Sequence, residues 1–163
     1  SRIRRKAGKQ IKSPTPNPAR GSSQGGNPAQ IRSPLPMTAA EETVSASTQA
    51  HALNALGYTL ADRTNRFPEA REYLDRALAL RPDDPFILDS MGWLMYRLGK
   101  PDDALRYLRR ALTQRSDAEI AAHLGEVLWV TGRRDEAKEI WNKALRETPD
   151  NEALLDVIKK FKP

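Results

Sequence analysis

The stretch that decides the fold runs from residue 85 to residue 116 and reads PFILDSMGWLMYRLGKPDDALRYLRRALTQRS. Apolar residues recur at helical spacing on both sides of the turn Gly99-Lys100-Pro101. Two amphipathic segments joined by a Gly/Pro turn predict two helices that fold back on one another. The pattern therefore predicts a helical hairpin, and the neighbouring sequence repeats it.

The same pattern occurs once before and once after this stretch. Each copy has a glycine within the first helix and two alanines, seven residues apart, in the second. The first-helix glycines are Gly57, Gly92 and Gly125, and the leading second-helix alanines are Ala70, Ala104 and Ala137. These alanines are separated by 34 and 33 residues. A period of this length indicates a solenoid of stacked helix pairs.

This period and these residues resemble the tetratricopeptide repeat (TPR). The resemblance implies an all-α fold, a right-handed α-solenoid of three TPR helix pairs with a C-terminal capping helix. The pairs are expected over about 50–84, 85–117 and 118–151, and the capping helix over 151–161. The family's helix pairs pack antiparallel, and each pair stacks on the next.

In such a fold the repeated glycines let a neighbouring helix pack against the backbone. That close approach offsets a helix-propensity cost of about 1 kcal/mol relative to alanine at each position. Leu56, Met91 and Leu124 are expected to fill the space between helices, and Trp141 a core site between two repeats. The first repeat would leave its outer face bare unless residues 38–48 cover it.

Capping residues and prolines predict where the individual helices begin and end. We expect helices over about 48–63, 68–80, 85–98, 101–114, 118–130, 134–147 and 151–161. Asp84 and Asp117 are expected to cap the helices that follow them. Pro85 and Pro101 are expected at first helical positions, where the missing N–H is not needed.

Residues 1–48 are expected to form a disordered basic tail or linker rich in Pro, Ser and Gly, and residues 49–163 the TPR domain. Thr38 and Glu41 form a capping-box pattern, which predicts the start of a short helix. The Ser/Thr-rich run over 43–48 is expected to interrupt it, because hydroxyl groups compete for backbone hydrogen bonds.

Charge is divided unevenly along the chain. Residues 1–40 hold eight Arg or Lys and no acidic residue, whereas the other 123 residues hold 19 basic against 21 acidic residues, a net charge of −2. The basic balance therefore gives no indication that the folded part binds nucleic acid. The favoured interpretation of the tail is a linker. The alternatives are a segment that contacts phosphate or anionic lipid, and a transit peptide.

Several functional classes find no support in the sequence. The absence of cysteine excludes disulfides, thiolate metal sites and a cysteine nucleophile. The two histidines, His51 and His123, fall in different repeats, so we expect no metal site. No phosphate-binding loop or nucleophile elbow is present, so we expect neither an enzyme nor a cofactor. No apolar run approaches the roughly 20 residues that span a bilayer, so no membrane insertion is expected.

The concave face of a TPR array is formed by the first helix of each repeat. The side chains expected there, besides His51, are Asn54, Tyr58, Asp62, Phe86, Asp89, Ser90, Trp93, Tyr96, Arg97, Glu119, His123, Glu126 and Trp129. They are rich in aromatic and acidic groups, which suits capture of a peptide or a partner helix. The alternative for Trp93 and Trp129 is packing between neighbouring helices.

This face lacks the converging Lys, Arg and Asn side chains with which some TPR domains clamp the carboxylate of a chaperone peptide. An acidic peptide end is therefore not the expected ligand. We expect a non-catalytic module that binds a protein or peptide and serves as an adaptor or scaffold. The alternative is a structural role in which the repeats stack on further TPR repeats or on a second copy.

A narrower resemblance concerns phrases such as HALNALGYTLADR and AEIAAHLGEVLWVTGRRDEAKEIW. They are similar to the C-terminal repeats of long proteobacterial TPR proteins, many of which are outer-membrane lipoproteins. Some of those proteins act as adaptors for a periplasmic processing protease. The resemblance implies a periplasmic or outer-membrane-associated location, with the cytoplasm as the alternative. Without cysteine, these 163 residues hold no lipid attachment site.

Overall fold

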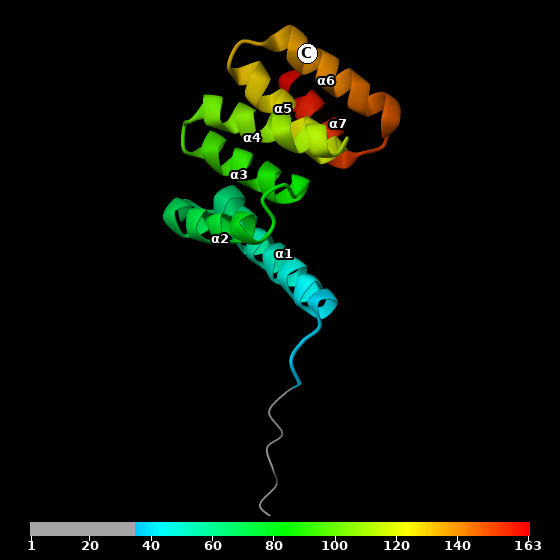
Figure 1. Ribbon diagram of the computed structural model, residues 1–163. Helices are drawn as coiled ribbons and strands as arrows, with labels where there is room; N and C mark the ends of the chain where they lie inside the picture. Colours follow the sequence, from blue (N-terminus) through cyan, green and yellow to red (C-terminus); the bar gives the residue numbers. More distant parts are fainter. Residues whose placement is uncertain (1–34) are drawn as a thin grey trace, which may run out of the picture. The chain divides into compact units, whose positions relative to one another are not determined.

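The computed structural model describes residues 35–163, and this part of the chain is built of helices and short connections (Figure 1). The helices are α1 (Ala39–Arg63), α2 (Phe67–Leu80), α3 (Pro85–Arg97), α4 (Pro101–Gln114), α5 (Ala118–Val130), α6 (Arg134–Glu147) and α7 (Glu152–Phe161). The predictions for residues 1–34 lie outside the described residues. Among the described helices, none has both the length and the apolar character needed to cross a membrane.

The helices stack as three pairs followed by a single helix. α1 packs against α2, α3 against α4, and α5 against α6. The first helices form one layer, because α1 contacts α3, α3 contacts α5, and α5 contacts α7. Each second helix also contacts the first helix of the next pair (Figure 1). The all-α solenoid is confirmed, and α7 takes the place of a fourth first helix that covers the third pair.

The paired helices come closest at the repeated glycines. A Cβ atom on Gly57 would lie 2.6 Å from Cγ of Leu74, and one on Gly92 would lie 2.6 Å from Cγ of Leu108. The partner alanines Ala70, Ala104 and Ala137 are fully buried. Any larger side chain at the glycines would push the two helices apart, so these positions set the spacing of each pair.

From α2 onward, the helix boundaries agree within one residue with those expected from the sequence. The side chains of Asp84 and Asp117 each accept hydrogen bonds from two backbone N–H groups of the following first turn. Pro85 and Pro101 stand at the start of α3 and α4. The side chain of Asn151 caps α7 by accepting one hydrogen bond, from the backbone N–H of Leu154. Local capping chemistry therefore fixes where each first helix begins.

α1 is one continuous helix of 25 residues, so the expected interruption over 43–48 is wrong. Thr38 and Glu41 form both hydrogen bonds of the capping box. The hydroxyls of Thr43 and Thr48 donate to carbonyl oxygens four residues earlier, at 2.8 and 3.0 Å. Because these bonds stay within the helix, they do not compete with its backbone ladder. Helix therefore begins directly after Thr38, upstream of the expected domain start.

One expected core position is also different. Met91 is 0% and Leu124 1% exposed, as expected for residues between helices, but Leu56 is 52% exposed. α3 and α5, which bear Met91 and Leu124, each pack against the second helix of the preceding pair. Within residues 35–163 no helix pair precedes α1, so Leu56 has no such neighbour.

Candidate functional site

The layer of first helices is concave. Tyr58 of α1 and His123 of α5 have ring centroids 6.1 Å apart, although α3 lies between these two helices in the stack. The ring of Trp93, on α3, stacks on His123 with a centroid distance of 4.4 Å. Side chains from helices two places apart thus meet over the middle one. We refer to this inner face of α1, α3, α5 and α7 as the groove.

The groove contains a first hollow of about 180 Å³ that lies over α3, with walls from α1 and α5. Its lining residues are Asn54, Ala55, Tyr58, Phe86, Asp89, Ser90, Glu119 and His123. All except Ala55 are residues that the helical spacing placed on the concave face. Three helices therefore contribute the predicted side chains to one cavity.

A second hollow of about 230 Å³ lies over α5, with walls from α3 and α7. Its lining residues are Trp93, Ala122, His123, Glu126, Ala153, Asp156, Val157 and Lys160. Trp93, His123 and Glu126 were expected in the groove, whereas the residues of α7 were missed, because α7 was interpreted only as a cap. The spacing held a signal, since Lys160 follows Glu126 by 34 residues, one repeat period.

Two buried carboxylates in the groove are paired across adjacent repeats. Asp89 and Glu126 are each only 7% exposed. Nδ1 of His123 lies 3.0 Å from both carboxylate oxygens of Asp89, and Nζ of Lys160 donates to Oε1 of Glu126 at 2.7 Å. Each pair spans 34 residues, about one repeat period, so each bond joins two successive first helices.

Burial and nearby carboxylates shift the pKa of two groups in the groove. Burial lowers the pKa of His123, but the carboxylates of Asp89 and Glu126, with smaller contributions from other acids, outweigh it, and the pKa is raised above its usual value. Burial, followed by the charges of Asp62 and Asp89, raises the pKa of Tyr58 to about 12. Both side chains therefore keep their protons to a higher pH than usual, as expected beside several carboxylates.

Three further predicted residues, on α1 and α3, line neither hollow. The carboxylate of Asp62 accepts a hydrogen bond from Nε1 of Trp93 at 3.1 Å. The backbone oxygen of Asp62 accepts one from Arg97 at 2.6 Å. Tyr96 packs against Trp93 with ring centroids 5.1 Å apart. These bonds hold Trp93 in place as a wall of the groove.

Trp129 and His51, too, line neither hollow. Trp129 packs against Trp141 of α6 and Phe161 of α7, with ring centroids 5.8 and 5.9 Å away. It therefore takes the alternative position, between neighbouring helices. His51 lies with Nε2 3.1 Å from Oδ2 of Asp84, the residue that caps α3. Its role in the fold is a contact between the first and second repeats.

The groove holds groups for recognition and lacks an arranged nucleophile. Ser90 shares the first hollow with Asp89 and His123, but its Oγ donates to the backbone oxygen of Phe86, within α3, at 3.0 Å. The hydroxyl is therefore not bonded to the imidazole that would have to accept its proton. Within residues 35–163, no group of three or more histidines and acidic residues is placed to hold a metal ion.

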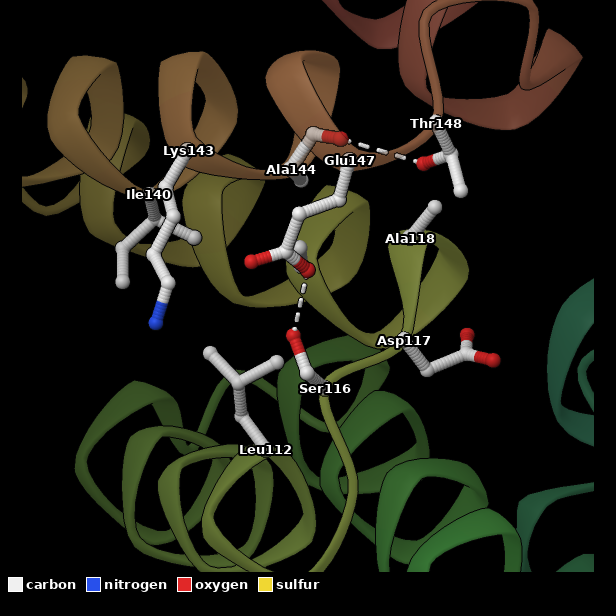
Figure 2. Close-up of a pocket in the computed structure, with 10 residues that line it drawn as sticks. Leu112, Ser116, Asp117, Ala118, Ile140, Lys143, Ala144, Glu147 and Thr148 are labelled. Atoms are coloured by element: carbon white, nitrogen blue, oxygen red, sulfur yellow. Dashed lines mark hydrogen bonds between the residues drawn. The ribbon is translucent and has the colours of Figure 1, made fainter.

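A smaller hollow of about 110 Å³ lies where α4, α5 and α6 meet (Figure 2). Figure 2 shows Ser116 and Glu147 facing one another across it, with Oγ of Ser116 donating to Oε2 of Glu147 at 2.7 Å. The hydroxyl of Thr148 donates to the backbone oxygen of Ala144. Since these polar groups are already bonded within the chain, this hollow offers a ligand fewer free hydrogen-bonding groups than the groove does.

Comparison with family models gives two matches, both described as tetratricopeptide repeat. One matches residues 48–117 and the other residues 95–160. Together they cover all three helix pairs, apart from the first turns of α1, and nearly all of α7. The matches therefore include every helix that lines the groove.

Relatives among curated proteins are much longer than this chain. A TPR repeat-containing protein of Pseudomonas aeruginosa is 68% identical over 77 residues, which are 47% of this chain and 13% of that protein. Anaphase-promoting complex subunit 7 of Mus musculus is 31% identical over 93 residues, which are 57% of this chain and 16% of that protein. The chain thus spans less than a fifth of either relative.

Solved structures show the same fold at low sequence identity. The first TPR of Spaghetti (RPAP3) bound to the HSP90 peptide SRMEEVD has a TM-score of 0.60 and 18% identity, covering 71% of this chain and 92% of that one. The second TPR domain of human RPAP3, in complex with the HSP70 peptide SGPTIEEVD, has a TM-score of 0.59 and 18% identity, covering 72% and 98%. Together with the repeat period and the two family matches, this likeness identifies the chain as a member of the tetratricopeptide repeat family.

Proposed function

We propose that the groove binds a segment of a partner protein and that the chain acts, without catalysis, as an adaptor or scaffold. The observation that carries this proposal is the row of two hollows along α1, α3, α5 and α7, with His123 as their shared wall. Hollows arranged in a line suit an extended peptide or a helix, whose side chains also repeat along a line. The peptide-bound TPR neighbours support the same use of the fold.

The walls of the groove are suited to tight contact. Tyr58, Phe86 and Trp93 supply aromatic surface, the kind of side chain on which binding energy concentrates. Trp93 is held by its hydrogen bond to Asp62, and His123 by Asp89. Side chains that are already fixed lose little conformational entropy when a partner binds. The groove therefore resembles a preformed recognition surface.

A peptide-display selection on the full chain tests the proposal. Peptides retained by the wild type are measured again on Phe86→Ala and Leu80→Ala. These residues are matched in exposure, at 39% and 36%, but only Phe86 lines a hollow. Affinity should fall by about fivefold or more with Phe86→Ala, which corresponds to about 1 kcal/mol. It should be unchanged with Leu80→Ala. Equal effects of the two changes, or no effect of either, would contradict binding in the groove.

A second candidate function is self-association through the outer face of α1. Leu56 is half exposed there, while its equivalents Met91 and Leu124 are buried by a preceding second helix. The same kind of surface is covered by a neighbouring helix on α3 and on α5, so the outer face of α1 is also suited to packing against a helix. The second helices of another copy are already covered by its own α3, α5 and α7, but its α1 presents the same bare face. We infer that two copies pack against one another through this face.

Light scattering over a dilution series tests the second candidate. The wild type should dissociate on dilution, and Leu56→Arg should be monomeric throughout, since a charge on this face prevents apolar packing. A wild type that is monomeric at high concentration would rule the second candidate out. That result would leave binding in the groove unaffected, because Leu56 lines neither hollow.

A further inference from the structure

The first hollow contains a hydrogen-bond acceptor without a donor. Oδ1 of Asn54 is buried and, within residues 35–163, has no hydrogen-bond partner. Buried polar atoms in native proteins are nearly always paired with protein groups or ordered water, so this oxygen lacks a donor among the described residues. The hollow has a volume of about 180 Å³, which is room enough for a side chain of a partner.

The same hollow contains two carboxylates, and the described residues pair only one of them with a basic group. Asp89 and Glu119 line it, while no lysine or arginine is among its lining residues. The imidazole of His123 lies within hydrogen-bond distance of both carboxylate oxygens of Asp89. Within the described part of the chain, Glu119 takes part in no ion pair. The hollow therefore presents acceptors, and the groups that would complement them are donors with positive charge.

The walls of the hollow also favour a cation. Tyr58 and Phe86 line it, and aromatic faces attract ammonium and guanidinium groups. The ring of Phe86 already lies 5.3 Å from the guanidinium carbon of Arg115, measured to the ring centroid. Lysine offers three donors and arginine five, and neither side chain carries an acceptor. Either could bond several of the hollow's acceptors without leaving a polar group of its own unpaired.

The chain uses this arrangement itself one repeat further along. In the second hollow, the buried carboxylate of Glu126 receives the ammonium group of Lys160, at 2.7 Å. Lys160 comes from α7, the helix that follows in the stack. The second hollow thus shows how a lysine fits between the first helices of this array. In the first hollow, His123 takes the corresponding place beside Asp89, and no lysine or arginine among the lining residues pairs with Glu119.

We propose that the first hollow binds a lysine or arginine side chain of the partner segment, between Asn54, Asp89 and Glu119. This inference rests on the proposed function, for which it names the chemistry of the partner. It also separates this groove from the structural neighbours, which hold the peptides SRMEEVD and SGPTIEEVD with acidic ends. Acidic ends of that kind would meet carboxylates of the same sign here.

The test uses the full chain and four libraries of capped heptapeptides with random flanks. The central residue is fixed as arginine, lysine, norleucine or glutamate, and the peptide SRMEEVD serves as an acidic control. Binding is measured for the wild type, Glu119→Gln and Glu72→Gln. Both glutamates are exposed, but Glu72 is on α2, outside the hollows. Circular dichroism confirms that each variant is folded.

We expect the arginine and lysine libraries to bind at least tenfold better than the norleucine and glutamate libraries. Glu119→Gln should reduce that preference at least threefold and leave norleucine binding unchanged, while Glu72→Gln changes nothing. The preference should also weaken at high salt, because the hollow is open to solvent. Asn54→Leu should reduce arginine and lysine binding as well, since it removes the buried acceptor.

Three results would overturn the inference, and they differ in what they say about the groove. If all libraries bind equally and Phe86→Ala abolishes binding, the groove binds peptides but does not select a cation. If no library binds, the proposed function fails together with the inference. Strong binding of the glutamate library or of SRMEEVD would also overturn it, because the groove would then resemble the chaperone-peptide type.

Discussion

Gly125 and Trp141 are in closer contact than the equivalent residues of the other two repeats. A Cβ atom built on Gly125 would lie 2.0 Å from Nε1 of Trp141, whereas the corresponding distances to leucine at Gly57 and Gly92 are 2.6 Å. Trp141 is 1% exposed. The third repeat thus places a flat, rigid ring against the backbone of α5 where the others place a branched aliphatic chain.

Gly125→Ala should therefore destabilise the domain. The added methyl group cannot fit without moving the indole, and overpacking of this kind costs about 1–3 kcal/mol. Alanine also favours a helix by about 1 kcal/mol over glycine, which acts in the opposite direction. Urea unfolding gives the net effect. A gain in stability would show that α5 and α6 can separate freely, and would contradict the close contact.

Trp141→Ala should cost about 3–5 kcal/mol, because it empties a fully buried site that no neighbouring side chain can fill. This is a large part of the total stability of a domain, about 5–15 kcal/mol. The adjacent Asn142 is exposed, and Asn142→Ala should stay within about 0.5 kcal/mol. Thermal unfolding of the two variants checks the prediction. A melting temperature of Trp141→Ala within a degree or two of the wild type would mean that the repeat register is different.

His123 should make the domain more stable at mildly acidic pH. Its pKa in the folded state is raised above 6.5, so the folded chain binds the proton more tightly than the unfolded chain does. The stabilisation is complete below about pH 6.5 and is lost as the pH rises past the folded-state pKa. The titratable groups around the imidazole are Tyr58 on α1, Asp89 on α3, Glu119 and Glu126 on α5, and Lys160 on α7.

The measurement is the free energy of unfolding in urea between about pH 5.5 and about pH 8. The wild type should lose stability relative to His123→Gln as the pH rises over this interval. Asp89→Asn should shrink the difference, since it removes the main charge that raises the pKa. A gap between wild type and His123→Gln that stays constant with pH would show that the imidazole keeps an ordinary pKa.

Lys160→Met should destabilise the domain because it leaves the carboxylate of Glu126 buried without a partner. Loss of one side of such a bond costs about 1–3 kcal/mol. The exposure of the lysine, 59% of its side chain, places the value near the lower end. The double variant Lys160→Met/Glu126→Gln should recover part of the loss, since the buried charge is then gone. Additive effects of the two changes would argue against coupling between α5 and α7.

Thr38→Ala should loosen only the beginning of α1. The change removes a capping box, which contributes about 1 kcal/mol to a helix terminus. Residues 39–45 are exposed, whereas Ala50 and Leu53 are buried. Hydrogen exchange should therefore accelerate over the first two turns and remain slow from Ala50 onward. Faster exchange across all of α1 would mean that the cap supports the whole helix.

Much of the fold could be predicted because it depends on local chemistry and on a repeated spacing. Asp84, Asp117 and the helix-start prolines mark the boundaries, and the glycines and alanines mark the contacts. The prediction that α1 is interrupted was wrong. It rested on helix propensity, in which Ser and Thr hydroxyls compete for the backbone hydrogen bonds of the helix. In the structure, Thr43 and Thr48 bond back within the helix. The prediction that Leu56 is buried was wrong because its burial needs a preceding helix. The position of Leu56 within its own repeat does not show whether such a helix is present.

The candidate site was partly predictable for the same reason. Helical spacing is enough to place Tyr58, Asp89 and His123 on one face, and the structure brings them together. Helical spacing could not show that Trp129 lies apart from these residues. A ring at the edge of that face can turn toward α6 and α7, as Trp129 does. The part played by Lys160 depends on where α7 docks. A contact between repeats is visible in a sequence only when residues one period apart are compared.

The bonds that join successive first helices also bear on how the array bends. His123 with Asp89 and Lys160 with Glu126 bridge neighbouring repeats on the inner side of the curve. If the superhelix straightens, this inner line is stretched, while the contacts between second and first helices on the other side act as the hinge. The paired carboxylates therefore oppose straightening at two places, between α3 and α5 and between α5 and α7.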